Sequence, residues 1–256
     1  MNRFAESDSG LWIPENYEGP WSQRRHFGSA ACRGLVSGGF DPTKLSGLEA
    51  YFLAHQGWTA SQWNDLSGRG NHLTQGNATQ QPTLATNWGG GLPAVQFDGI
   101  NDSMFRSTLA GGTIAQQTTI VVVFETAGPA SPAAVVDSRD GANRQLVADS
   151  STFIGHYAGS YCQASRTFST PEKVIFTGVF NGASSSCRVR RSGLSTLTQS
   201  GTTGSGSLNG LTVGNAFNDG AGLAGKIAAL CVLRRGLAAA EQLLLEGFFT
   251  SLYRFT

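Results

Sequence analysis

The chain has 256 residues, of which 40% are hydrophobic and 14% are charged, and its formal net charge is +1 at pH 7. A net charge this close to zero is not typical of a nucleic-acid-binding surface or of a basic membrane-binding face, so we expect neither partner. With 34 glycines, the composition favours many short strands joined by tight turns, and one all-β domain can reach this length.

The N-terminal segment (1–39) differs from the remainder of the chain (40–256), and we expect it to form an irregular arm used for anchoring or assembly. Its aromatic and arginine side chains follow no helical or strand period, and these residue types commonly anchor protein interfaces. An alternative is that the arm wraps its own domain. The candidate anchoring residues are Trp12, Tyr17, Trp21, Arg24, Arg25 and Phe27.

From residue 48 onward, β-type patterns recur at short spacing, which favours an antiparallel sandwich over a βαβ arrangement. The segment Thr118–Thr126 is a continuous run of β-branched and aromatic residues, typical of a strand buried on both faces. Residues 75–91 are expected to be a loop. The other expected strands are Glu49–Leu53, Ala133–Asp137, Arg144–Ala148, Thr152–Tyr157, Tyr161–Ser165, Lys173–Phe180, Ser186–Arg191, Leu208–Val213 and Lys226–Leu233. The two strands on either side of Asn181 are expected to form a hairpin.

Two polar stretches carry the most specific local signals. Gln62–Gln75 reads QWNDLSGRGNHLTQ and is expected to form an ordered corner, in which His72 bonds to backbone. Pro93–Phe105 reads PAVQFDGINDSMF and has the alternation and Asp-Gly turn of a β-hairpin. Together these stretches resemble the laminin-G-like branch of the concanavalin A-like lectin/glucanase superfamily, and the resemblance extends over about residues 40 to 254. It implies a two-sheet jelly-roll sandwich, and such modules are common in bacteriophage virion proteins and bacterial surface proteins.

The C-terminal segment is expected to be the one substantial helix. Its apolar residues at fourfold spacing predict a buried stripe made of Ala240, Leu244, Phe248 and Leu252, widened by Leu245 and Phe249. Ala238 occupies the N-cap position, so only Glu241 can supply its half of a capping box.

No arrangement of catalytic residues is apparent in the sequence. Glucanases of the superfamily resembled here carry a Glu-x-Asp-x-Glu triplet on one strand, and this chain has none. The nearest acidic pair, Asp137 and Asp140, lies at a junction between a strand and a loop. We therefore expect that the chain is not an enzyme and has no catalytic residues; a divergent hydrolase is the third hypothesis.

The four cysteines, Cys32, Cys162, Cys187 and Cys231, show neither CxxC nor zinc-finger spacing, so we expect no metal site. Their even number permits two disulfide bridges, but nothing in the spacing demands them, and we expect free buried thiols. No cofactor is expected. Binding of Ca²⁺ is the alternative, because two groups of oxygen-bearing residues offer two or three ligands each. These groups are Asp98, Asn101 and Asp102, and Asn215, Asn218 and Asp219.

A glycan site would require aromatic platforms beside amide or charged partners. The candidate glycan-binding residues are Tyr157, Tyr161, Arg188, Arg190 and Asn215. The resemblance and the arm together favour a non-enzymatic structural protein of a virus particle, such as a bacteriophage capsid decoration, head-fibre or tail-associated protein. It would be assembled in the host cytoplasm, since the start shows no secretory signal, and bound to other virion proteins through the arm, with self-association and a host-surface glycan as further partners. The alternative is a carbohydrate-binding module of a bacterial surface or secreted protein.

Overall fold

The chain divides into two compact units, Met1–Leu35 and Val36–Thr256. The computed structural model describes residues 4–6, 12–14, 39–126, 128–129, 131–141, 143–167, 171–192 and 196–255. In the first unit, β1 (Phe4–Glu6) pairs antiparallel with β2 (Trp12–Pro14), so two short strands lie in a stretch that we expected to be irregular. The boundary at residue 39 stays a prediction.

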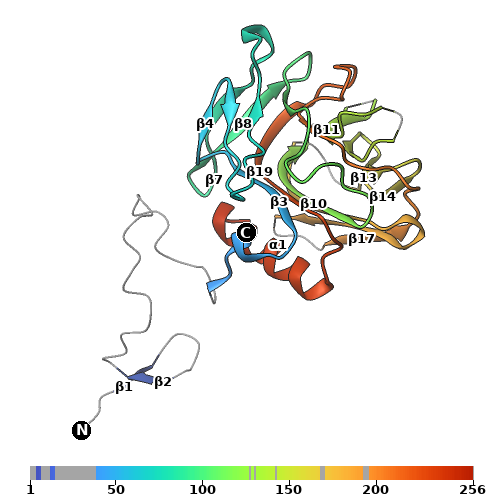
Figure 1. Ribbon diagram of the computed structural model, residues 1–256. Coiled ribbons are helices and arrows are strands. Elements are labelled where there is room, and N and C mark those ends of the chain that lie inside the picture. Colours follow the sequence, from blue (N-terminus) through green and yellow to red (C-terminus); the bar gives the residue numbers. More distant parts are fainter. Residues whose placement is uncertain are drawn as a thin grey trace. The chain divides into compact units, whose positions relative to one another are not determined.

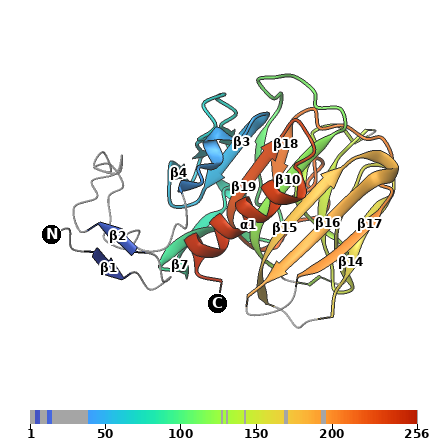
Figure 2. The ribbon, with the colours of Figure 1, turned by 90° about the horizontal axis from the view of Figure 1, so that it is seen from below.

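The second unit contains two antiparallel sheets, seen in Figure 1 and, after a quarter turn, in Figure 2. We name each sheet after one of its central strands. The β10 sheet has the strand order β17-β16-β15-β10-β19-β8-β7, and β3 also pairs with β19. The β12 sheet has the order β14-β13-β12-β11-β18-β9-β6-β5-β4. The expected two-sheet antiparallel sandwich is confirmed.

The strands of the β10 sheet have the bounds β3 (Leu48–Leu53), β7 (Thr83–Gly89), β8 (Leu92–Asp98), β10 (Thr118–Thr126), β15 (Glu172–Phe180), β16 (Ser185–Arg191), β17 (Leu197–Gly201) and β19 (Ala224–Leu233). Those of the β12 sheet are β4 (Trp58–Thr59), β5 (Gln62–Trp63), β6 (Leu73–Thr74), β9 (Met104–Arg106), β11 (Ala133–Asp137), β12 (Leu146–Asp149), β13 (Phe153–Tyr157), β14 (Tyr161–Ser165) and β18 (Leu211–Val213). Short 3-10 turns cover η4 (Pro42–Lys44), η5 (Ala78–Gln80) and η6 (Gly182–Ser184).

The main core lies between the two sheets, and β10 shows how the sequence fills it. Successive side chains of a strand point to opposite faces. Val122 and Phe124 of β10 belong to the core between the sheets, whereas Val121 and Val123 belong to a second core on the other face of the β10 sheet. The strand is therefore buried on both faces, as its unbroken apolar run predicts.

The second core is covered by the helix α1 (Ala239–Tyr253), which crosses the outer face of the β10 sheet in Figure 2. Glu241 accepts a hydrogen bond from the backbone N–H of Ala238 at 3.0 Å, so the expected half capping box is confirmed. Among the described residues, no helix is long and apolar enough to cross a membrane.

The predicted apolar stripe of α1 is partly wrong. Leu244 is 55% exposed, whereas Leu245 and Phe249, which were expected only to widen the stripe, are buried and with Tyr253 form the centre of the face that packs on the sheet. Both stripes have a spacing of four residues, so periodicity alone cannot choose between them. The packing is decided by Glu246, which is buried beside Leu245 and bonds to the side chain of Thr177 at 2.9 Å.

The hairpin expected around Asn181 is confirmed, because β15 and β16 pair antiparallel. The hairpin expected over Pro93–Phe105 is wrong: β8 belongs to the β10 sheet, and β9 belongs to the β12 sheet. The Oδ1 atom of Asp98 accepts hydrogen bonds from the N–H groups of Ile100 and Asn101, and this turn carries the chain from one sheet to the other. The loop expected over residues 75–91 also contains β7, an edge strand whose side chains are mostly exposed, so it lacks the apolar pattern of an inner strand.

The corner over Gln62–Gln75 is ordered as expected. The Oδ1 atom of Asp65 accepts hydrogen bonds from the backbone N–H groups of Tyr51 and Ser67, and its Oδ2 atom accepts from that of Asn71. His72 accepts from the N–H of Asp65 through Nδ1 at 3.0 Å, which confirms its predicted backbone bond. This corner is a structural anchor for β3, because the bond to Tyr51 fixes the middle of that strand.

Candidate functional site on the outward face of the β12 sheet

A row of side chains crosses the outward face of the β12 sheet. Direct cross-strand partners run from Tyr161 on β14 to Tyr157 on β13, then to Leu146 on β12 and Asp137 on β11. The row continues through Thr212 on β18 to Phe105 on β9. Because opposite residues of antiparallel strands share a face, this register gathers residues from distant parts of the sequence.

Aromatic side chains occupy one end of this row. The ring centroids of Tyr157 and Tyr161 are 4.9 Å apart, and Phe153 lies 5.2 Å from Tyr161. Tyr161 is 39% exposed, so one large ring is offered to solvent while its neighbours hold it in place. Burial raises the pKa of Tyr161, so its hydroxyl stays protonated and can donate a hydrogen bond at neutral pH.

A buried carboxyl lies in the middle of the row. The Oδ2 atom of Asp137 is 3.4 Å from Nη1 of Arg144 and accepts a hydrogen bond from the N–H of Phe217 at 3.1 Å; its Oδ1 atom accepts one from the N–H of Ser138 at 2.9 Å. Burial nevertheless raises the pKa of Asp137 to about 6, because the nearby Arg144 and these N–H donors offset only part of the cost of removing the charge from water.

Two arginines follow Asp137 and lie against aromatic rings. The guanidinium of Arg144 is 5.8 Å from the ring centre of Tyr157 and 5.7 Å from that of Phe217. The guanidinium of Arg139 is 4.5 Å from the ring centre of Phe105 and donates to the carbonyl of Phe217 at 3.2 Å. Cation–π contacts of this kind hold the planar groups in defined orientations.

The loop between β11 and β12 needs a glycine under the ring of Phe217. A Cβ atom on Gly141 would lie 2.2 Å from Cζ of that ring, so only glycine allows the ring to cover the loop at this point. The result is a partly exposed surface of tyrosine rings, guanidinium donors and one buried carboxyl. We refer to Tyr157, Tyr161, Arg139, Arg144 and Asp137 as the β12 face.

The structure brings together only part of the predicted glycan set. Tyr157 and Tyr161 are neighbours on the β12 face. Arg188 lies on β16 in the other sheet, where its Nε donates to the buried carboxylate of Glu246 on α1 at 2.9 Å. Arg190 is two residues further along the same strand, on the side that faces the helix.

Asn215 is fully buried. Its Oδ1 atom accepts hydrogen bonds from the N–H groups of Ala216 and Ala221, so the side chain closes the loop after β18. This arrangement places Asn215 beneath the surface and out of reach of a ligand on the sheet.

The other predicted site residues have different outcomes. Trp12 lies in β2, and the remaining anchoring candidates, Tyr17, Trp21, Arg24, Arg25 and Phe27, lie outside the described residues, so the anchoring role stays a prediction. In the first Ca²⁺ group, the Oδ1 atom of Asp98 accepts backbone N–H groups, and these hydrogen bonds lower its pKa against the opposing effect of burial. In the second group, Asn218 accepts from the N–H of Gly220. Both groups therefore already serve as turn-forming acceptors.

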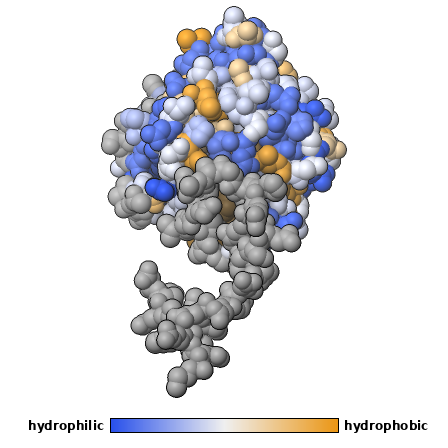
Figure 3. All heavy atoms as spheres, turned by 90° about the vertical axis from the view of Figure 1, so that its left-hand side faces the viewer, coloured by the Kyte–Doolittle hydropathy of each residue, from blue (hydrophilic) through white to orange (hydrophobic). Residues whose placement is uncertain are grey.

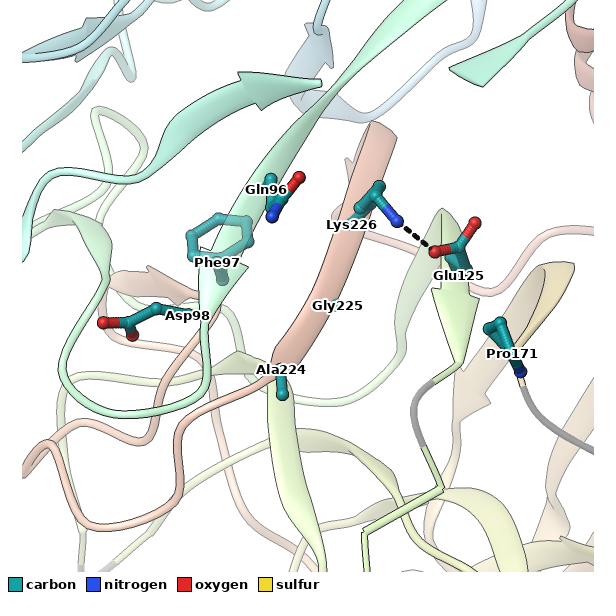
Figure 4. A pocket seen from close by; sticks show the side chains of 8 residues that line it. All are labelled: Gln96, Phe97, Asp98, Glu125, Pro171, Ala224, Gly225 and Lys226. Carbon is teal, nitrogen blue, oxygen red and sulfur yellow. Dashed lines mark hydrogen bonds and ion pairs between the residues drawn. The ribbon is translucent and has the colours of Figure 1, made fainter. Parts of the chain in front are cut away.

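A hollow of about 320 Å³ lies on the other sheet, next to Gln96, Lys226 and Glu125 (Figure 4). Glu125 is ion-paired with Lys226 and accepts a hydrogen bond from the indole N–H of Trp88 at 2.9 Å, so both of its oxygens are engaged. Phe97, the one aromatic residue that lines the hollow, is only 2% exposed. The other carboxylate in the lining, that of Asp98, points away from Lys226 and Glu125 in Figure 4. The lining therefore offers no exposed aromatic ring of the kind that Tyr161 supplies on the β12 face.

The molecular face shown in Figure 3 is mostly hydrophilic, with hydrophobic residues in small scattered groups. Isolated apolar side chains are normal on a protein surface. This view of the molecule therefore does not add a third candidate site.

No protein-family model matches the sequence, and no curated protein matches it. Among solved structures, the chain is similar to a Trypanosoma rangeli sialidase in complex with sialic acid, with a TM-score of 0.57 and 13% identity over 85% of this chain and 35% of the sialidase chain. It is also similar to a GH54 α-L-arabinofuranosidase soaked with a cyclic sulfate inhibitor, with a TM-score of 0.54 and 14% identity over 75% of this chain and 50% of that chain.

Both of these structures are of glycosidases. This chain spans about a third of the length of the first and half of the length of the second. At such low identity, the likeness establishes the β-sandwich fold, and the activities of whole relatives do not transfer with it.

These similarities correct two predictions. We expected a structural protein of a virus particle and expected that the chain is not an enzyme, but the similar structures are of glycosidases. The prediction failed because it searched for one triplet of carboxylates on a single strand. Residues that strand register places on one face of a sheet, such as Asp137 and Tyr161, leave no contiguous motif in the sequence.

The sequence reasoning missed Arg139 and Arg144 as site residues, and it treated Asp137 only as half of an acidic pair. One signal was available, because the stretch DSRDGANR concentrates charges directly after a buried strand. That signal does not show which way the arginines turn, because Arg144 lies against Tyr157 and Phe217 and Arg139 against Phe105, and these rings come from other parts of the chain.

Proposed function

We propose that this chain is a carbohydrate-active domain that binds a saccharide on the β12 face. The observation that carries the proposal is the exposed ring of Tyr161, which is held beside Tyr157 in the same cross-strand row as Asp137, while Arg144 lies against the ring of Tyr157 and pairs with Asp137. A sugar ring has an apolar face and an edge of hydroxyl groups. Proteins commonly bind such a ligand by stacking an aromatic ring on the apolar face and placing polar groups where they bond to the hydroxyls.

Each residue has a distinct role in this proposal. Tyr161 supplies the platform, and Tyr157 holds it in place. Arg144 is fixed by Asp137 and by the ring of Tyr157, so its remaining N–H groups can donate to sugar hydroxyls without a large loss of side-chain entropy. Asp137 is buried and acts as a positioning residue for Arg144.

The similar structures support the same class of ligand. The sialidase was solved with sialic acid, and an arabinofuranosidase structure, similar to this chain with a TM-score of 0.50, was solved with arabinofuranosyl-α-1,2-xylobiose. The proposal also retains the concanavalin A-like assignment for the sandwich, which the quoted motifs support. The two saccharides named in these structures are an acidic and a neutral probe for this chain.

The test is a calorimetric titration of the full chain with each of these two saccharides. Tyr161→Ala should weaken binding about tenfold or more, equivalent to about 1.4 kcal/mol, whereas Tyr161→Phe should retain most of the affinity. Leu244→Ala is the matched control, because Leu244 is an exposed apolar residue on α1, which packs on the other sheet. Equal affinity for Tyr161→Ala and the control would refute the site.

A second candidate function, glycoside hydrolysis, is favoured by the raised pKa of Asp137. A carboxyl with a pKa of about 6 remains partly protonated near neutral pH, as a general acid requires. Its burial means that a substrate would have to displace Phe217 or Arg144 to reach it. The assay is hydrolysis of 4-nitrophenyl α-L-arabinofuranoside, a substrate soaked into a mutant of the similar arabinofuranosidase. Turnover by the wild type that Asp137→Asn abolishes would establish this function, and equal turnover by both would remove Asp137 from it.

A further inference from the structure

One cluster of potential metal ligands lies away from the β12 face, inside the sandwich. His156 on β13 and Cys162 on β14 are direct cross-strand partners, and both side chains point into the space between the sheets. Cys187 reaches the same place from β16 of the opposite sheet. One ligand atom from each residue lies within 4.8 Å of the others, and all three residues are buried.

The imidazole of His156 supplies the second, independent observation. The residue is fully buried, and among the described residues neither Nδ1 nor Nε2 makes a hydrogen bond of standard geometry, although the backbone of Val179 lies close enough to act on the ring. It lies between aromatic rings, with the Phe180 ring centre 4.5 Å and the Phe176 ring centre 6.0 Å away. Leaving a buried polar group unpartnered is unfavourable, so such groups call for an explanation.

We propose that His156, Cys162 and Cys187 bind a thiophilic metal ion, such as Zn²⁺ or Cu⁺, which joins the β12 sheet to the β10 sheet from within. Thiolate and neutral imidazole are the ligands that these ions prefer. The sequence spacing gave no sign of the site, because its ligands lie on three strands and the third comes from the other sheet.

The geometry requires only a small closure of the cluster. Ligand atoms around a tetrahedral Zn²⁺ are separated by about 3.8 Å, since Zn–S bonds are about 2.3 Å and Zn–N bonds about 2.0 Å long. The present limit of 4.8 Å therefore leaves a contraction of about 1 Å. The Sγ atom of Cys162 now points toward the carbonyl oxygens of Ser185 and Gln199, at 3.9 and 3.8 Å, and it would turn from these weak contacts to the metal.

Metal binding would change the charge of the cluster in a balanced way. Both thiols release a proton when they become ligands; Zn²⁺ then offsets the two thiolates completely, whereas Cu⁺ leaves the buried cluster with one negative charge, which favours Zn²⁺ at this site. A bound metal would also give a ring nitrogen of His156 a strong partner in place of its poor contact with the backbone of Val179. Because ligands come from both sheets, binding would stabilise the folded state over the unfolded one.

The test uses the full chain, purified under reducing conditions, stripped with a chelator and titrated with Zn²⁺ alone and with Cu⁺ alone. We expect one equivalent of at least one of these ions to bind and to raise the unfolding temperature. Cys187→Ser and His156→Phe should each lose the stoichiometric binding and the temperature shift. Phe at position 156 suits the aromatic surroundings, so this variant should remain folded without metal.

Cys231→Ser is the matched control. Cys231 is equally buried but lies in the second core, on the helix side of the β10 sheet, so its loss should leave metal binding unchanged. Binding far below one equivalent by the wild type, or equal binding by His156→Phe, would overturn the proposal. So would a mass two hydrogens lower after purification, if peptide mapping assigns it to a Cys162–Cys187 disulfide.

Discussion

Replacing Asp137 with Asn tests whether burial or the nearby Arg144 dominates at this carboxyl. The pKa of Asp137 is raised from 3.8 to about 6 in the folded chain. At about 1.4 kcal/mol per pH unit, this shift corresponds to about 3 kcal/mol. Between the two pKa values, the folded state holds a proton that the unfolded state has released, so the free energy of unfolding of the wild type should fall as pH rises from about 4 to about 6.

Asn cannot titrate, so the wild type minus Asp137→Asn difference isolates this contribution from those of other groups. Asn also faces donors on both sides, from the N–H groups of Ser138 and Phe217, and one of them will meet its amide NH₂ group. That loss of about 1–3 kcal/mol is independent of pH. In urea unfolding at pH 4, 5, 6 and 7, the stability of the wild type relative to Asp137→Asn should therefore fall by about 2.4 kcal/mol from pH 4 to pH 7, because the unfolded carboxyl is already more than half ionised at pH 4. A difference that stays constant, or that grows in favour of the wild type with pH, would show that Arg144 outweighs burial.

The remaining predictions concern stability and are measured by chemical unfolding at neutral pH. Arg188→Met leaves the carboxylate of Glu246 buried without its ion-pair partner, so the loss should be about 3–5 kcal/mol, and adding Glu246→Leu should recover much of it; no recovery would contradict this reasoning. Leu245→Ala should cost about 2–5 kcal/mol, whereas Leu244→Ala, one residue away and exposed, should change stability by less than about 0.5 kcal/mol; equal losses would show that the helix packs by another face. Gly206→Ala places a Cβ atom 2.3 Å from the carbonyl oxygen of Arg144 and should cost at least about 1–3 kcal/mol, whereas Gly76→Ala meets nothing within 4 Å; similar stabilities of the two variants would refute the contact.

Local sequence signals predicted local structure well. The unbroken run of Thr118–Thr126 specified a strand buried on both faces, and the polar corner around Asp65 and His72 formed as its turn chemistry indicates. These features depend on neighbours within a few residues. The Asp98-Gly turn shows where such signals end, because the same turn chemistry serves a hairpin and a crossing between sheets. Only the pairing of β8 with β19 and of β9 with β18 distinguishes the two.

The candidate site depends on strand register, which the sequence does not display. Tyr157 and Tyr161 are close in the chain, so the sequence could predict that they are neighbours. Asp137 and Phe105 lie in the same cross-strand row only because of their partners on β12 and β18. Arg188 illustrates the same limit, since the sequence does not show that this arginine pairs with a buried glutamate of α1. His156 and Cys187 likewise meet only because the two sheets face each other.

The central claim is that a saccharide binds on the β12 face, and nuclear magnetic resonance mapping tests it most directly. The isotope-labelled chain would be titrated with sialic acid and, separately, with arabinofuranosyl-α-1,2-xylobiose. The account predicts that at least one of the two shifts the signals of Tyr157, Tyr161 and Arg144, while those of Trp88 and Lys226 at the hollow on the other sheet stay in place. Shifts confined to Trp88 and Lys226, or no shifts with either saccharide, would contradict it.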